Sequence, residues 1–140
     1  MIKRIVSRLI KKHKTNDPFE IAAQKNIIIL FNYLGGTFGF FSTYKRAKFI
    51  HINSNLDEPM QRFVCAHELG HVVLHPNVNT PFMRAHTLFS IDKIEKEANK
   101  FAVELLIPDE IVHEHETIFA AAASCGVPAE VAILKRINHL

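Results

Sequence analysis

QRFVCAHELGHVVLH, residues 61–75, contains His67, Glu68 and His71 in the pattern HExxH. Residues four apart on an α-helix lie on one face, about 6 Å apart, so both imidazoles can bind a single metal ion. Glu68 flanks the same pocket, where its carboxylate can reach a metal-bound water without binding the metal itself. The stretch therefore predicts a helix that carries part of a hydrolytic metal site.

A catalytic zinc ion needs a third protein ligand and an open fourth position for water. His75 follows on the same helix, but it lies about 12 Å from His67 along the axis, too far to bind the same ion. Metalloproteases that use a later third histidine insert a glycine turn before it, and no glycine separates His71 from His75. We therefore place His75 at the C-terminal end of the helix, where the helix dipole favours it.

Glu95 is the better candidate for the third ligand. It lies on a predicted helix over residues 91–107, where it shares a face with Asn99 and with two small alanines that let helices approach closely. Asn99, one turn further on, can accept the outer N–H of a ligand histidine. Glu97 points about 200° away around the helix and is predicted to be solvated. The alternative for Glu95 is a surface ion pair with a neighbouring lysine.

Length and composition indicate one domain spanning residues 1–140. Hydrophobic residues make up 48% of the chain and charged residues 22%, which is typical of a folded protein rather than a disordered one. No apolar run approaches the length of a membrane span. The N-terminus lacks the apolar core of a secretory signal, and there are only two cysteines. We expect a cytoplasmic monomer with free thiols, in which Cys65 belongs to the core.

Positive charge is concentrated at the N-terminus. Six of the 17 basic residues lie in the first fourteen positions, where no acidic residue occurs. Apolar residues recur there at helical spacing, which predicts a basic amphipathic helix over residues 1–14. One interpretation is a helix packed on the core with a solvated basic face, and the other is contact with an acidic partner or nucleic acid.

The pattern of elements predicts an α+β fold, with a small three-stranded antiparallel sheet packed on a pair of helices. Asp17 and Pro18 mark the start of a short helix that ends near Gln24. Strands are predicted at residues 27–31, 37–44 and 48–53, the first of them buried on both faces. Short connections imply a meander in which residues 48–52 form an exposed edge able to hold an extended substrate.

The other predicted helices follow from periodicity and from proline stops. They cover residues 58–74, 91–107, 110–124 and 128–138, and residues 109–140 form the C-terminal helices.

HELGHVVLHP at 67–76 and EKEANKFAVELLIPDE at 95–110 together resemble the ImmA/IrrE metallopeptidases, a gluzincin-like group. The resemblance extends over most of the chain. It implies one zinc ion, with Glu68 as catalytic base and, as metal ligands, His67, His71 and Glu95. It also implies a protein substrate, because many members are small cytoplasmic proteases of prophages or mobile elements that cleave a helix-turn-helix repressor encoded nearby.

Three functions compete. The first is a zinc endopeptidase that cleaves such a repressor, and the second is a metal-containing anti-repressor that sequesters it without cleavage. The third is a DNA-binding module, because the last two predicted helices resemble a helix–turn–helix outline. That second helix offers only Lys135, Arg136 and Asn138, so we favour the endopeptidase and expect no direct nucleic-acid binding. The residue that assists zinc in stabilising the oxyanion stays open between His86 and Tyr44.

Overall fold

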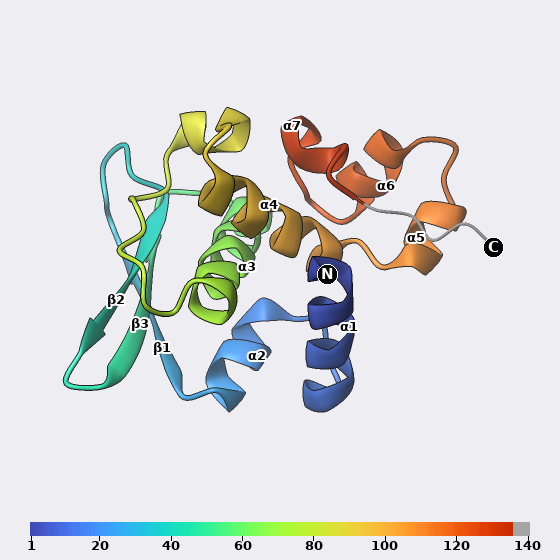
Figure 1. Cartoon of the computed structure of the whole chain (residues 1–140). Coiled ribbons are helices and arrows are strands. Elements are labelled where there is room, and N and C mark those ends of the chain that lie inside the picture. The colour runs from blue at the N-terminus through green and yellow to red at the C-terminus, as the bar shows by residue number, and fades with distance from the viewer. Residues whose placement is uncertain (136–140) are drawn as a thin grey trace.

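Helix α3 (Glu58–Leu74), which carries the HExxH motif, lies at the centre of the computed structural model, in which residues 1–135 are described (Figure 1). It packs on helix α4 (Lys93–Leu106) and on two strands, β2 (Gly39–Tyr44) and β3 (Ala47–Asn53). Ten consecutive residues of α3, Phe63 to Val72, are buried. Burial on all sides explains why this helix lacks a polar face, and it places both histidines of the motif away from solvent.

Three aspartates cap the starts of helices by accepting hydrogen bonds from backbone N–H groups. They are Asp17 before α2 (Pro18–Gln24), Asp57 before α3 and Asp92 before α4, at 3.0, 2.9 and 3.2 Å. The predicted starts of α2 and α3 are confirmed. Helix α4 begins two residues later than predicted because its cap is Asp92.

The sheet contains β1 (Ile27–Asn32), β2 (Gly39–Tyr44) and β3 (Ala47–Asn53) in the spatial order β1-β3-β2. Strands β2 and β3 are antiparallel, whereas β1 and β3 are parallel. The α+β class is confirmed, but the antiparallel meander is wrong. Residues 48–52 are also not an edge, because β3 is the central strand and its Ile50 is fully buried.

Asn53 stabilises the connection that separates β1 from β2 in the mixed sheet. Its buried side chain holds the connection between β1 and β2: Nδ2 donates to the backbone oxygens of Gly35 and Thr37 at 2.9 and 3.0 Å, and Oδ1 accepts from Leu34 N–H at 3.3 Å. This connection is therefore a fixed loop rather than a tight hairpin, and it carries the chain past β3 to the far edge. Alternation within a strand does not reveal which edge the next strand occupies.

Strand β1 is the other edge of the sheet, and the prediction that it is buried on both faces is wrong. Ile27 is buried, but Ile28, Leu30 and Phe31 are 44, 36 and 48% exposed. The ring of Phe31 is partly covered by Phe19 of α2, with centroids 6.0 Å apart. The run of apolar residues in β1 therefore reflects strand propensity rather than burial on two faces.

Helices α3 and α4 approach closely at Gly70. A Cβ atom at this position would lie 3.0 Å from Cδ1 and 3.1 Å from Cβ of Phe101, closer than side chains ordinarily pack. Phe101, Ala98 and Ala102 of α4 are fully buried. The small residues of α4 were predicted to let two helices approach closely. On α3, Gly70 inside the HExxH motif has the same role.

We expect Gly70→Ala to destabilise the protein by about 1 kcal/mol. Alanine favours the helix by about 1 kcal/mol over glycine, but overpacking a core typically costs 1–3 kcal/mol, and Phe101, which the new methyl would press, is fully buried. Urea unfolding of the metal-free variants measures the difference. Gly36→Ala is the control, because a Cβ atom there would meet nothing within 4 Å. Equal stability of the two variants would contradict the argument.

Helix α1 (Ile2–His13) packs on α4 and buries Ile2, Val6 and Leu9. Most of its cations face solvent. The interpretation of the basic N-terminus as a helix packed on the core is therefore confirmed.

Four charged side chains join α1 to the C-terminal part of the chain. Lys3 Nζ lies 2.7 Å from Asp109 Oδ1 and 3.3 Å from Glu104 Oε1. Lys135 Nζ lies 2.7 Å from Glu104 Oε1 and 2.8 Å from Asp109 Oδ1. Both Lys135 and Glu104 are buried, so their charges are paired away from water. Lys135 is therefore not available to contact a DNA base as the helix–turn–helix reading requires.

The C-terminal helices are shorter than predicted. They are α5 (Asp109–His113), α6 (Ile118–Ser124) and α7 (Ala129–Ala132). The predicted helix 110–124 divides in two because Thr117 starts α6 by accepting a hydrogen bond from Ala120 N–H at 3.0 Å. Arg136 and Asn138 lie outside the described residues. Among the described helices, none combines the length and the apolar character needed to cross a membrane.

Candidate metal centre

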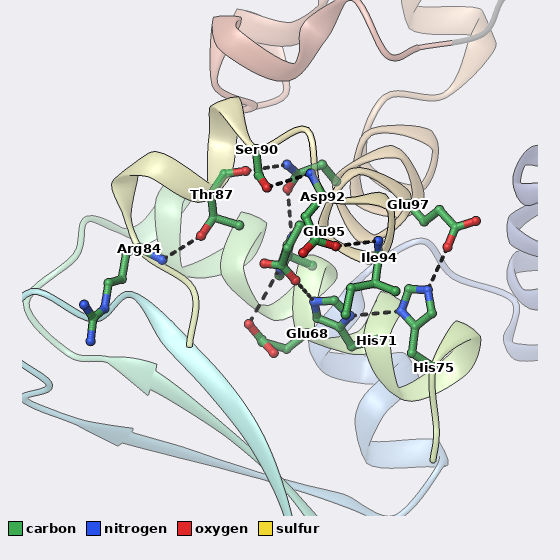
Figure 2. A network of polar contacts seen from close by, with 12 residues as sticks. Glu68, His71, His75, Arg84, Thr87, Ser90, Asp92, Ile94, Glu95 and Glu97 are labelled. Carbon is green, nitrogen blue, oxygen red and sulfur yellow. Dashed lines mark hydrogen bonds and ion pairs between the residues drawn. The ribbon is translucent and has the colours of Figure 1, made fainter. Parts of the chain in front are cut away.

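His67, His71 and Glu95 converge where α3 and α4 pack together. Glu95 Oε1 lies 2.5 Å from His71 Nε2, and Glu95 Oε2 lies 3.6 Å from His67 Nε2. One ligand atom from each residue lies within 4.8 Å of the other two. All three residues are buried, and Figure 2 shows Glu95 facing His71 from the neighbouring helix. The structure thus brings together the three predicted ligands around a position that one metal ion can occupy.

Several buried polar atoms at this site make no well-aligned hydrogen bond, although Glu95 Oε1 lies against His71 Nε2. Within residues 1–135 they are Nε2 of His67, Nε2 of His71 and both carboxylate oxygens of Glu68 and Glu95. Each buried polar atom left unpaired costs about 1–3 kcal/mol, and charged ones cost more. A metal ion with a bound water would satisfy them, and imidazole with carboxylate is a donor set that transition-metal ions accept. The residues present therefore fit a metal ion.

Asn99 orients His67. Its Nδ2 donates to the backbone oxygen of Thr87 at 3.0 Å, so its Oδ1 is the atom that faces His67 Nδ1, at 2.8 Å. Nδ1 of His67 must then carry the hydrogen, which leaves the lone pair of Nε2 directed to the metal position. Asn99 therefore makes the contact predicted for it, and it also ties the site to the short helix η1 (Ala85–Phe89).

His71 is supported in a different way. Its Nδ1 lies 3.0 Å from Nδ1 of His75, and Nε2 of His75 lies 2.9 Å from Oε1 of Glu97 (Figure 2). His75 ends α3, as predicted, and its ring faces away from the metal position. The prediction that Glu97 is merely solvated is wrong, because its carboxylate pairs with His75. Sequence reasoning missed this contact, which depends on how far α4 is rotated against the last turn of α3.

The two glutamates of the site differ in charge. Burial raises the pKa of Glu68 to about 7; the carboxylate of Glu95 adds to this increase and His67 opposes it. Burial also raises the pKa of Glu95, but contacts with His67 and His71 outweigh it and lower that pKa to about 2. Glu95 stays negatively charged, as a metal ligand requires, while Glu68 can accept and release a proton near neutral pH.

Cys65 lies in the core beside the motif. It is fully buried, and burial raises the pKa of its thiol. A thiol that is neither exposed nor ionised is unreactive, which fits the predicted packing role.

A groove of about 640 Å³ runs along β2. It is lined by Phe41, Ser42 and Thr43 of β2, by Lys48 and by residues 76–80. Phe41 connects it to the candidate metal centre, because its ring centroid lies 6.3 Å from that of His71. On the side of β2 away from β3, the only bridge within the described residues joins Gly39 to Met83. The groove therefore lies against β2, a strand whose outer edge is largely unpaired within the described residues.

The two oxyanion candidates lie on different elements. Tyr44 ends β2, where it pairs with Ala47 and is 65% exposed. His86 is exposed on η1, the segment that Asn99 ties to the site. Of the two, His86 lies on the element connected to the metal position.

Comparison with known proteins agrees with this geometry. The family profile of the IrrE N-terminal-like domain matches residues 22–135, which include the entire candidate centre. Metallopeptidase ImmA from Bacillus subtilis (strain 168) is 41% identical over 115 residues, covering 81% of this chain and 67% of the relative. A protein of Bacillus phage phi105 named "Uncharacterized immunity region protein 2" is 51% identical over 145 residues, covering 100% of this chain and 92% of the relative.

The fold, the site and these similarities define the class of the protein as a metallopeptidase. Within that class, the chain belongs to the ImmA/IrrE family, which the two motif segments of α3 and α4 had indicated. The family resemblance predicted from the sequence is thereby confirmed.

Proposed function

We propose that the protein is a zinc-dependent endopeptidase. The observation that carries this proposal is the set of unpartnered buried atoms that surrounds one position between α3 and α4. Two imidazoles and one carboxylate are the ligand set of a catalytic zinc ion, whereas structural zinc sites have four protein ligands. Glu68 adds the catalytic element, because its Oε2 lies 3.9 Å from His67 Nε2 without completing the ligand set.

The mechanism follows from these positions. Zinc bound by His67, His71 and Glu95 would polarise the scissile carbonyl and acidify a water molecule. Glu68 acts as general base: its carboxylate takes a proton from the attacking water and then returns it to the leaving amine nitrogen. Asn99 holds the ring of His67 so that Nε2 faces the site throughout.

We place the substrate along the free edge of β2. An extended peptide segment can pair with the backbone of an edge strand, and the groove beside β2 includes Phe41, whose ring centroid lies 6.3 Å from that of His71. This replaces residues 48–52 as the substrate strand, because both sides of β3 are already paired. The exposed chain of a protein loop fits such an edge better than a folded surface does.

The substrate we propose is a helix-turn-helix transcriptional repressor, as the family resemblance implies. The name of the phage relative assigns that protein to an immunity region, a setting in which a repressor is expected. A DNA-binding repressor works in the cytoplasm, so we expect the peptidase there as well.

The test is to incubate the zinc-loaded protein with the helix-turn-helix repressor encoded beside its gene and to record intact masses. We expect two fragments whose masses add up to the repressor plus one water molecule. Protein stripped of metal with a chelator is the control and should leave the repressor whole. A repressor that is bound tightly but never cut would overturn the endopeptidase and favour sequestration.

A further inference from the structure

His71, His75 and Glu97 form a continuous chain of contacts from the metal position to the surface (Figure 2). His71 is fully buried, His75 is 7% exposed, and the side chain of Glu97 is 28% exposed. His71 and His75 stand four residues apart on α3, and Glu97 reaches them from α4. The chain therefore crosses the interface that forms the metal centre.

The positions of the hydrogens along this chain follow from chemistry. A histidine that offers Nε2 to a metal ion keeps its hydrogen on Nδ1, so His71 donates from Nδ1 to Nδ1 of His75. His75 must accept at that nitrogen and therefore carries its own hydrogen on Nε2. This hydrogen is donated to the carboxylate of Glu97 at 2.9 Å. Each of the two contacts thus has one donor and one acceptor.

The two ligand histidines are supported unequally. The partner of His67 is the neutral amide of Asn99, whereas the chain behind His71 ends in a negative charge. Three lysines, Lys93, Lys96 and Lys100, line a surface pocket together with Glu97, on a different part of the protein from the groove at β2. Within residues 1–135, the structure nevertheless pairs Glu97 with His75 and with none of these lysines. The carboxylate is therefore directed to the metal centre and not to its nearest cations.

We propose that His75 and Glu97 are positioning residues that set the metal affinity of the site through His71. His75 fixes the hydrogen on Nδ1 of His71 and the plane of its ring. Glu97 polarises His75, which makes His75 a better acceptor and Nε2 of His71 a stronger donor to the metal ion. A carboxylate at the surface, outside the ligand set, thereby controls how firmly the ion is held.

The proposal predicts a specific order of zinc dissociation constants, measured by competition with a chromogenic chelator. His75→Ala should raise the constant about 10–100-fold, because removing a group that orients a ligand typically has this effect. Glu97→Gln should raise it roughly tenfold, since the amide still accepts the hydrogen bond but lacks the charge. Glu116→Gln, the same change at an exposed position outside the chain, should stay within about twofold of wild type.

Combining the substitutions tests whether the effect passes through His75. The double variant His75→Ala with Glu97→Gln should bind zinc as His75→Ala alone does, because within the described residues Glu97 contacts His71 only through His75. If the two substitutions instead raise the zinc dissociation constant by independent factors that multiply in the double variant, the proposal is overturned. So would a Glu97→Gln variant whose zinc affinity equals that of wild type.

Two readouts separate positioning from a purely structural tie between α3 and α4. In the zinc-loaded protein, nitrogen NMR of the imidazoles should show the Nδ1–H of His71 hydrogen-bonded in the wild type, and this hydrogen bond should be lost in His75→Ala. A structural tie alone would lower the midpoint of thermal unfolding of the metal-free protein without changing the zinc affinity. The proposal rests on the zinc site of the proposed function, but it survives if no repressor is cleaved, because zinc binding and the hydrogen bond are measured without substrate.

Discussion

Glu68→Gln is expected to abolish peptidase activity while leaving zinc bound and the fold intact. The side chain is fully buried and neither carboxylate oxygen has a hydrogen-bond partner within the described residues. An amide of the same shape therefore breaks no existing hydrogen bond. It cannot take a proton from the attacking water, however, so the step that the buried carboxylate performs is lost.

The expected loss in kcat/KM is about 10²–10⁴-fold, the range over which positioned acids and bases act. Cleavage is followed by intact mass, and zinc content is measured in the same samples. Glu116→Gln again serves as the matched control, because it makes the same change at an exposed carboxylate. A Glu68→Gln variant that cleaves at the wild-type rate would remove Glu68 from the mechanism. One that binds the repressor and releases repression without cleavage would show that sequestration suffices.

Removal of the metal ion is expected to lower the stability of the whole fold. The ligands come from α3 and α4, and without the ion their buried nitrogen and carboxylate atoms lack well-aligned hydrogen bonds. An ion that binds only the folded state stabilises it by about 4 kcal/mol when its concentration is about a thousand times Kd. For a chain of this length that corresponds to a shift of roughly 10–16 °C in Tm.

Thermal unfolding with zinc, with a chelator and with zinc restored measures this effect. His67→Ala provides the matched comparison, because its Tm should no longer respond to zinc. Loss of one imidazole leaves too few ligands for tight binding. A wild-type Tm that is insensitive to the chelator would show that the three side chains do not hold an ion.

The HExxH part of the site was predictable because its spacing is local. His67 and His71 share a helix face wherever the helix packs, and Asp57 and Pro76 define where that helix starts and ends. Glu95 is separated from the motif by a loop, so the family resemblance and the small residues around it were needed to find it. Asn99 followed from Glu95 by helical spacing.

The sheet was less predictable because its order depends on a contact between distant residues. The amide of Asn53 holds the loop that separates β1 from β2, and nothing in the alternation of either strand reveals it. The link between His75 and Glu97 was missed for the same reason, since it depends on the relative rotation of two helices. Local patterns predict elements, but the packing between elements determines neighbours.

The double contact of Asn99 has a consequence for how the enzyme could diverge. One amide accepts from His67 and donates to Thr87, two tasks that need opposite ends of the same side chain. Aspartate could accept the hydrogen bond from His67 but would repel the backbone oxygen of Thr87. Lysine could donate to that oxygen but could not accept from His67. The orientation of His67 and the attachment of η1 therefore depend on the same side chain. A substitution of Asn99 that alters one of them also alters the other.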